Sequence, residues 1–270
     1  QLRGTAYNWF SSAADRPHPA PLLMPPAVLK PIAARLGQHF LDEKQYDKAI
    51  GEYQQVLLAN ADQAVFVFAC AHPDPKLRML DRFLVITEKQ RVPAVIVANK
   101  IDLVENAKEL FGFYEPIGYR VIYTSTRTGV GVDELHDTLK NKISALAGPS
   151  GAGKSSLLNA IQPGLGLAVN EISTAMNKGR HTTVTRQMFP LVGGGYVADT
   201  PGWKSLALWD TEAVEMEAYF PELRDLVQGC QFSDCTHTHE PNCAVLAAVK
   251  EGRVHPERFD SFLRLRAGQE

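Results

Sequence analysis

The sequence predicts an α/β fold in which helices cover both faces of a doubly wound, mostly parallel sheet. From residue 61 onward, short continuous apolar runs such as 64–69 (AVFVFA) and 93–98 (PAVIVA) alternate with amphipathic stretches. Continuous apolar runs of this length are typical of parallel strands that are buried on both faces. Several runs are followed at once by a polar or Gly-rich motif, which is where such a sheet carries its functional site.

Each element is predicted from its own pattern. Residues 75–90 (PKLRMLDRFLVITEKQ) place their leucine, phenylalanine and isoleucine side chains on one face of a helix. Strand-length apolar runs predict the strands 64–69, 93–98, 119–123, 143–147 and 196–198. Helical spacing predicts the helices 75–90, 106–113, 132–141, 156–161, 244–250 and 256–265.

Composition places the chain among ordinary globular proteins. It has 270 residues and a net charge of −2, with 45% hydrophobic and 21% charged residues. This balance gives no indication of a nucleic-acid-binding protein, so any basic patch must be local. No apolar run approaches the roughly 18 residues that a membrane helix needs. Four cysteines, three of them close together, suit a metal site in a reducing compartment, so we expect a cytosolic or organelle-matrix protein that does not enter a membrane. The simplest expectation is a cytoplasmic monomer.

The chain divides into segments of different character. Residues 1–31 are rich in proline and are expected to form an arm or linker. Residues 32–60 resemble one tetratricopeptide unit, a helical hairpin that either serves as plain packing or binds a protein partner. Residues 61–209 carry the α/β pattern. Residues 210–270 are expected to form a helical zinc-binding domain.

A P-loop follows the predicted strand 143–147. Residues 148–155 (GPSGAGKS) fit the pattern G-x-x-x-x-G-K-[ST] and lead into a predicted helix. Glycines let backbone N–H groups curl around a phosphate, and the helix N-terminus adds a positive dipole end. Lys154 is expected to reach the β- and γ-phosphates, and the Ser155 hydroxyl to bind Mg²⁺. The predicted phosphate-binding residues are Gly148, Ser150, Gly151, Ala152, Gly153, Lys154, Ser155 and Ser156.

A second motif predicts which base the nucleotide carries. Asn99-Lys100-Ile101-Asp102 directly follows the strand 93–98 and matches N-K-x-D. The Asp102 carboxylate can accept hydrogen bonds from guanine N1–H and the 2-amino group, which adenine does not offer. Asn99 is expected to brace the loop, and Lys100 to lie along the base. Ser125 and Thr126 follow the next strand, where their backbone amides would meet guanine O6. The predicted ligand is therefore GTP or GDP.

The remaining phosphate-side motifs come later in the chain. Asp199-Thr200-Pro201-Gly202 matches D-x-x-G, so that Asp199 would hold Mg²⁺ and the Gly202 amide would sense the γ-phosphate. Thr182 and Thr183 lie between the P-loop and this motif, and Thr183 is the expected switch residue and Mg²⁺ ligand. A threonine pair on a strand surface is the alternative. The base-reading motifs thus precede the phosphate-binding motifs, which is a circular permutation of the usual order.

A cysteine cluster near the C-terminus predicts a metal site. Cys230, Cys235, His237 and Cys243 give C-x4-C-x-H-x5-C, a donor set that closes a tetrahedral structural Zn²⁺ site. The alternative is a group of free buried cysteines. His239 is a rival ligand, expected to lie on the loop surface. Cys70, at the end of a strand, is expected to be a core residue.

These motifs together resemble one family. GPSGAGKSSLLNAI, GRHTT, DTPGW, LRMLDRFL at 77–84 and the cysteine cluster make the chain, from about residue 61 to its C-terminus, similar to the RsgA family of circularly permuted GTPases. The resemblance implies GTP hydrolysis that is stimulated by the small ribosomal subunit and coupled to its late maturation. It also implies a hydrophobic residue after D-x-x-G, here Trp203, in place of a catalytic glutamine. His181 is then the candidate for orienting the attacking water, with Lys154 and Thr183 at the phosphates.

The N-terminal part departs from the family. The resemblance implies an N-terminal OB-fold barrel that binds rRNA, but residues 1–60 show neither short alternating strands nor Gly turns. Either the barrel is replaced, or the sequence omits part of the natural chain. The alternative function is a GTP-switched adaptor whose hairpin at 32–60 binds a protein partner. A P-loop kinase acting on a small molecule is a third reading, which a guanine preference would oppose.

Overall fold

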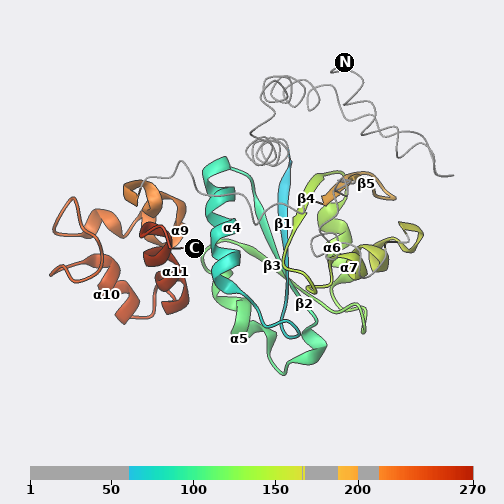
Figure 1. Ribbon diagram of the computed structural model, residues 1–270, viewed down its shortest axis with the longest axis horizontal. Coiled ribbons are helices and arrows are strands. Elements are labelled where there is room, and N and C mark those ends of the chain that lie inside the picture. Colours follow the sequence, from blue (N-terminus) through green and yellow to red (C-terminus); the bar gives the residue numbers. More distant parts are fainter. Residues whose placement is uncertain (1–60, 166, 168–187, 200–212, 270) are drawn as a thin grey trace, which may run out of the picture.

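The computed structural model describes residues 61–165, 167, 188–199 and 213–269. Within these residues, six strands form a sheet in the order β3-β2-β1-β4-β6-β5 (Figure 1). The strands are β1 (Gln63–Ala69), β2 (Ala94–Asn99), β3 (Arg120–Thr124), β4 (Ile143–Ala147), β5 (Met188–Pro190) and β6 (Tyr196–Asp199). All neighbouring pairs are parallel except β5 and β6. The predicted doubly wound, mostly parallel sheet is confirmed.

The central strand β1 supplies side chains to two apolar layers. Its alternate residues Phe66 and Phe68 pack in a cluster with residues of α4 (Leu77–Gln90) and α5 (Ala107–Phe111). Val65 and Val67 point to the opposite face, in a cluster with residues of α6 (Val132–Leu139) and α7 (Lys154–Ile161). Because β1 is covered on both faces, all of its residues are buried. This explains its unbroken apolar run.

The C-terminal residues form a smaller helical unit beside α4 (Figure 1). Its helices are α9 (Pro221–Arg224), α10 (Ala244–Lys250) and α11 (Pro256–Arg266), with 3₁₀ turns at Ala213–Tyr219 (η5) and Val227–Gly229 (η6). Phe220 and Phe262 pack edge to face in its core, with ring centroids 5.4 Å apart. Val85 of α4 joins the same cluster. The core of this unit is thus continuous with the surface of the sheet domain.

The structure changes some predicted boundaries. The helix predicted at 75–90 begins at Leu77, and the helix predicted at 132–141 ends at Leu139. The helix predicted at 106–113 consists of α5 and a 3₁₀ turn, η2 (Gly112–Tyr114). The helix predicted at 156–161 begins earlier, at Lys154. Two further 3₁₀ turns are present: η1 (Ile101–Leu103) after β2, and η3 (Pro163–Leu165) after α7. The arm and the hairpin predicted at 1–60 lie outside the described residues.

None of the helices in the described ranges is long and apolar enough to cross a bilayer.

Candidate functional site

The P-loop connects β4 to α7 at the carboxyl edge of the sheet. Gly148 follows β4 directly, and Gly153 is the residue that precedes the first turn of α7. Gly153 has φ +92°, and a Cβ at this position would lie 2.3 Å from Asn99 Nδ2. A side chain is therefore excluded both by backbone conformation and by the close approach of Asn99. The sequence prediction of a strand, a Gly-rich turn and a helix is confirmed.

The Lys154 ammonium is held by the loop itself. Its Nζ donates to the carbonyl oxygens of Gly148 and Pro149, at 2.8 and 2.9 Å. Two carbonyl acceptors fix the ammonium inside the curve of the loop, where the predicted β- and γ-phosphates would lie. Ser155, on the first turn of α7, is also buried. Its hydroxyl belongs to the oxygen donors that Mg²⁺ prefers.

Asn99 joins the predicted base-reading motif to the P-loop. Its side-chain Nδ2 donates to the Ala152 carbonyl at 2.8 Å, and its Oδ1 accepts from the Thr124 hydroxyl at 3.0 Å. Asn99 and Thr124 are buried at the ends of β2 and β3. These contacts bring residues that are far apart in the sequence to one edge of the sheet. The expectation that Asn99 braces the loop agrees with this geometry.

The Asp102 carboxylate is oriented by the loop after β3. Ser125 Oγ accepts from the backbone N–H of Thr128 at 3.2 Å and donates to Asp102 Oδ1 at 2.6 Å. The second oxygen, Oδ2, lies 3.8 Å from the guanidinium of Arg127. Ser125 is buried, whereas the Arg127 side chain is 78% exposed. The Asp102 carboxylate is therefore held in one orientation, and Thr126, the residue after Ser125, is exposed.

Two residues at this edge of the sheet are not predicted from the sequence. Thr124 lies just beyond the predicted strand 119–123 and directly before Ser125, and the structure makes it the last residue of β3. Arg127 follows Ser125 and Thr126 in the same loop, and its guanidinium lies 3.8 Å from the predicted base-reading carboxylate of Asp102. A cation at this position can stack on a purine ring. Proximity to the motif was the available signal for both.

We expect Thr124→Val to weaken guanine-nucleotide binding about tenfold. Valine keeps the shape of threonine but leaves the buried Asn99 Oδ1 without its donor, which costs about 1–3 kcal/mol and frees the amide to turn away from Ala152. The check is the GDP dissociation constant, measured by titration. Thr138→Val is the matched control, because Thr138 is buried and its hydroxyl donates to the Glu134 carbonyl within α6. Equal GDP affinity in the two variants would contradict the role given to Thr124.

The later phosphate-side residues are only partly described. Asp199 is the last residue of β6, and its Cα is paired with Leu146 of β4, near the start of the P-loop. The backbone register therefore brings the end of β6 to the phosphate side of the edge. His181, Thr182, Thr183, Gly202 and Trp203 lie outside the described residues, and their roles stay predictions.

The cysteine cluster converges in the C-terminal unit. The ligand atoms of Cys230, Cys235, His237 and Cys243 all lie within 4.8 Å of one another. Cys230 and Cys243 sulfurs are 3.9 Å apart, and His237 Nδ1 lies 3.3 Å from Cys243 Sγ. A tetrahedral Zn²⁺ site with Zn–S bonds of about 2.3 Å requires sulfur separations of about 3.8 Å. The donor set therefore fits zinc in both chemistry and spacing.

A second layer of contacts fixes the histidine ligand. His237 Nε2 lies 3.0 Å from Glu217 Oε1, which also accepts from Arg266 at 3.1 Å. A carboxylate on the far nitrogen of a ligating histidine selects the tautomer that presents Nδ1 to the metal. Burial raises the pKa of the Cys235 thiol to about 12. A cation among the sulfurs would supply the charge that a thiolate needs in this buried place.

Two neighbouring predictions hold. His239 is exposed on the loop between the ligands, away from the four converging donors. Cys70 is buried at the end of β1. Burial raises the pKa of the Cys70 thiol to about 11, with a smaller contribution from the Asp102 carboxylate. Cys70 is accordingly an inert core residue.

The fold and the site define a circularly permuted P-loop GTPase, because base-reading strands that come first in the chain meet a P-loop that comes later. The family model described as RsgA GTPase matches residues 38–209. The chain belongs to the RsgA GTPase family and is a GTP hydrolase.

Relatives with similar sequences and structures agree with this placement. The small ribosomal subunit biogenesis GTPase RsgA of Gemmatimonas aurantiaca is 50% identical over 219 residues, which cover 80% of this chain and 71% of that protein. The protein of the same name from Thermotoga neapolitana is 43% identical and covers 77% of this chain and 71% of its own length. The crystal structure of YjeQ from Thermotoga maritima superposes with a TM-score of 0.66 at 39% identity, covering 77% of this chain and 71% of that one. The crystal structure of YloQ, a circularly permuted GTPase, superposes with a TM-score of 0.61 at 33% identity, covering 77% of this chain and 68% of that one.

Proposed function

We propose that this chain is an assembly factor for the small ribosomal subunit whose GTP hydrolysis is stimulated by that subunit. The observation that carries the nucleotide part is the pair of hydrogen bonds through which Asn99 joins the P-loop to β3. They join the P-loop to the strand end that precedes Asp102, the proposed guanine-reading residue. The ribosomal part is supported by relatives that are named small ribosomal subunit biogenesis GTPases.

In this proposal, Asp102 reads guanine and Lys154 binds the terminal phosphates. The backbone amides of residues 151–156 would surround the β-phosphate, and the Ser125 and Thr126 amides would meet guanine O6. Ser155, Thr183 and Asp199 would hold Mg²⁺, which neutralises charge between the β- and γ-phosphates. Catalysis of this kind is mostly electrostatic and positional.

The attacking water needs an orienting group. Trp203 stands in the sequence position where many GTPases carry glutamine, and an indole has no acceptor for a water proton. His181 is the proposed orienting residue, with Thr183 and Gly202 as sensors of the γ-phosphate. Without a catalytic glutamine, hydrolysis would stay slow until contact with the subunit orders the attacking water. This is the reason to expect stimulation.

We also propose a division of labour along the chain. Residues 61–209 would bind and hydrolyse GTP, while 210–270 would use the zinc held by Cys230, Cys235, His237 and Cys243 to maintain a surface for the subunit and its rRNA. Residues 1–31 would form an arm and 32–60 a helical hairpin. The protein would act as a monomer in the cytoplasm, where small subunits mature.

The test is GTP turnover with and without purified small ribosomal subunits. We expect turnover to rise at least tenfold with small subunits and to stay at the basal rate with large subunits, which serve as the control. Lys154→Ala should abolish both rates, which shows that the measured hydrolysis belongs to this site. Turnover that is unaffected by small subunits would contradict the proposal and favour the adaptor, in which the hairpin at 32–60 binds a protein partner.

A further inference from the structure

Helix α4 carries a stripe of charged residues toward the C-terminal unit. Arg78, Asp81, Val85 and Glu88 recur at helical spacing along one face. Val85 is buried among apolar residues of the C-terminal unit. Asp81 Oδ1 lies 2.8 Å from Arg258 Nη1 of α11, and Arg78 lies 3.1 Å from Asp260 of the same helix. Glu88 pairs with Arg224 of α9. We refer to this contact as the α4 seam.

The centre of the α4 seam is a buried ionic cluster. Asp81 and Arg258 are both fully buried. Arg258 also donates through Nε and Nη2 to the two carboxylate oxygens of Glu222, at 2.7 and 3.1 Å. The Tyr114 hydroxyl donates to Asp81 Oδ1 at 2.6 Å. Burial disfavours the charged guanidinium, but Asp81 and Glu222 outweigh it, so that the pKa of Arg258 is raised and the side chain remains charged.

The partners of this cluster are divided between the two sides of the seam. Arg258 and Glu222 both belong to the C-terminal unit, and Asp81 and Tyr114 both belong to the sheet domain. Separation of the two sides would leave each charged group with a partner on its own side. Replacement of a buried ion pair by well-packed apolar residues of the same size is often neutral or stabilising, so such a pair adds specificity more than stability. The arrangement therefore favours one docking position that can also open.

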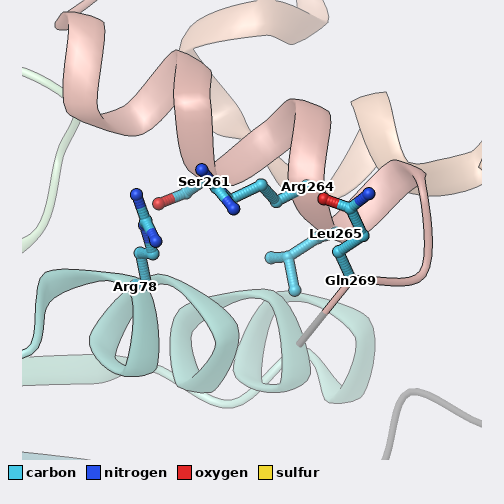
Figure 2. A pocket seen from close by; sticks show the side chains of 5 residues that line it. All are labelled: Arg78, Ser261, Arg264, Leu265 and Gln269. Atoms are coloured by element: carbon cyan, nitrogen blue, oxygen red, sulfur yellow. The ribbon is translucent and has the colours of Figure 1, made fainter.

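The packing of the seam agrees with a contact that can open. A cavity of about 50 Å³ lies between α4 and α11, lined by Arg78, Ser261, Arg264, Leu265 and Gln269 (Figure 2). In Figure 2 the Arg78 side chain of α4 points across the seam toward α11. Around the buried Val85 the contacts of the seam are mainly polar, and polar contacts between domains of one chain resemble transient interfaces, which permit relative motion.

Helix α4 also leads to the nucleotide site. The loop at 70–76 connects β1 to α4 and lies against the residues that bind nucleotide. Its His72 carbonyl accepts from Lys100 Nζ, and a methyl group on Gly151 would lie 3.2 Å from Pro73 Cδ. The backbone N–H of Cys70 donates to the Asn99 carbonyl at 2.8 Å. A shift of α4 would thus act on the base-reading lysine and on the P-loop.

We propose that the α4 seam is a latch that couples docking of the zinc-bearing unit to guanine-nucleotide affinity, through α4 and the loop at 70–76. This proposal rests on the nucleotide site of the proposed function. Coupling between sites is reciprocal, so bound nucleotide must change docking if docking changes nucleotide affinity. The usual size of such coupling is about 5- to 150-fold in affinity.

The test uses the full chain and Asp81→Ala, which removes the acceptor across the seam and leaves the Arg258–Glu222 pair intact. Glu134→Ala is the matched control, because Glu134 pairs with Arg120 within the sheet domain and away from the seam. Hydrogen exchange of α4 and α11 reports docking, and titration reports the GDP and GTP dissociation constants. We expect Asp81→Ala to raise exchange in both helices and to change at least one dissociation constant by about fivefold or more, while Glu134→Ala changes neither.

Raised exchange with dissociation constants within twofold of the wild type would overturn the coupling, and unchanged exchange would overturn the latch itself. If Asp81→Ala does not fold, Glu88→Gln, which removes the charge of the pair with Arg224, is judged by the same two readouts. The wild type is titrated in parallel. A wild type that binds no guanine nucleotide would refute the proposed function. If the wild type binds normally and the variant has the same dissociation constants, only the coupling is refuted.

Discussion

Asp102→Asn is expected to transfer the base preference of this protein from guanine to xanthine. Guanine offers N1–H and a 2-amino group, and both match a carboxylate. Xanthine keeps N1–H but carries an oxygen at position 2, which matches the donor of an amide. Loss of charge-assisted hydrogen bonds of about 1.5–3 kcal/mol each should weaken GDP binding at least 100-fold.

The surroundings of Asp102 determine which way the new amide would face. Ser125 Oγ donates to Oδ1 at 2.6 Å, and one of its lone pairs accepts from the N–H of Thr128. Keeping this donated hydrogen bond places the asparagine oxygen at the Oδ1 position, so that the NH₂ group replaces Oδ2. This orientation presents one acceptor and one donor to the base, the pattern that xanthine complements.

The measurement is a titration of GDP and of xanthosine diphosphate against wild type and variant. Asp133→Asn is the matched control, since Asp133 is an exposed carboxylate in the first turn of α6. Wild type and control should prefer GDP, and Asp102→Asn should prefer the xanthine nucleotide. A variant whose GDP affinity stays within threefold of the wild type would refute the assignment of Asp102 as the base-reading residue.

Removal of zinc is expected to unfold the C-terminal unit while the sheet domain persists. Cys235, His237 and Cys243 are buried, and the two cysteines lie in the same apolar cluster as Phe220 and Phe262. Cys243 also precedes α10, where its sulfur accepts from the Leu246 N–H at 3.4 Å. Structural zinc supplies about 10–16 kcal/mol in small zinc-finger peptides. The apolar core of a unit of this size cannot supply an equivalent free energy of folding.

Zinc content and hydrogen exchange together check this prediction. We expect one zinc per chain, and a chelator should raise exchange across 213–269 far more than across 61–165. Cys243→Ala should show the same pattern without a chelator. Cys70→Ala, which removes a buried cysteine outside the cluster, should keep its zinc. Comparable exchange in both regions after zinc is lost would contradict a structural role for the metal.

The residues of the site differ in how far the sequence predicts their roles. The P-loop and the N-K-x-D motif are short and have a fixed spacing along the chain, so the sequence predicts roles for Lys154, Ser155 and Asp102. Thr124 was not assigned, because its function depends on a contact with Asn99 on a neighbouring strand. Strand register brings these residues together, and a strand shows only its own alternation, not its neighbour.

Local chemistry follows from short stretches of the sequence: buried strands from continuous apolar runs, a phosphate loop from its glycines, and a zinc donor set from the spacing of three cysteines and a histidine. The tertiary structure alone decided which of these parts meet. Asn99 meets Ala152 and Asp81 meets Arg258 across long stretches of chain. Hydrogen bonds and ion pairs act over a few ångströms of space, whereas a motif is defined along the chain, so only folding brings such partners within reach.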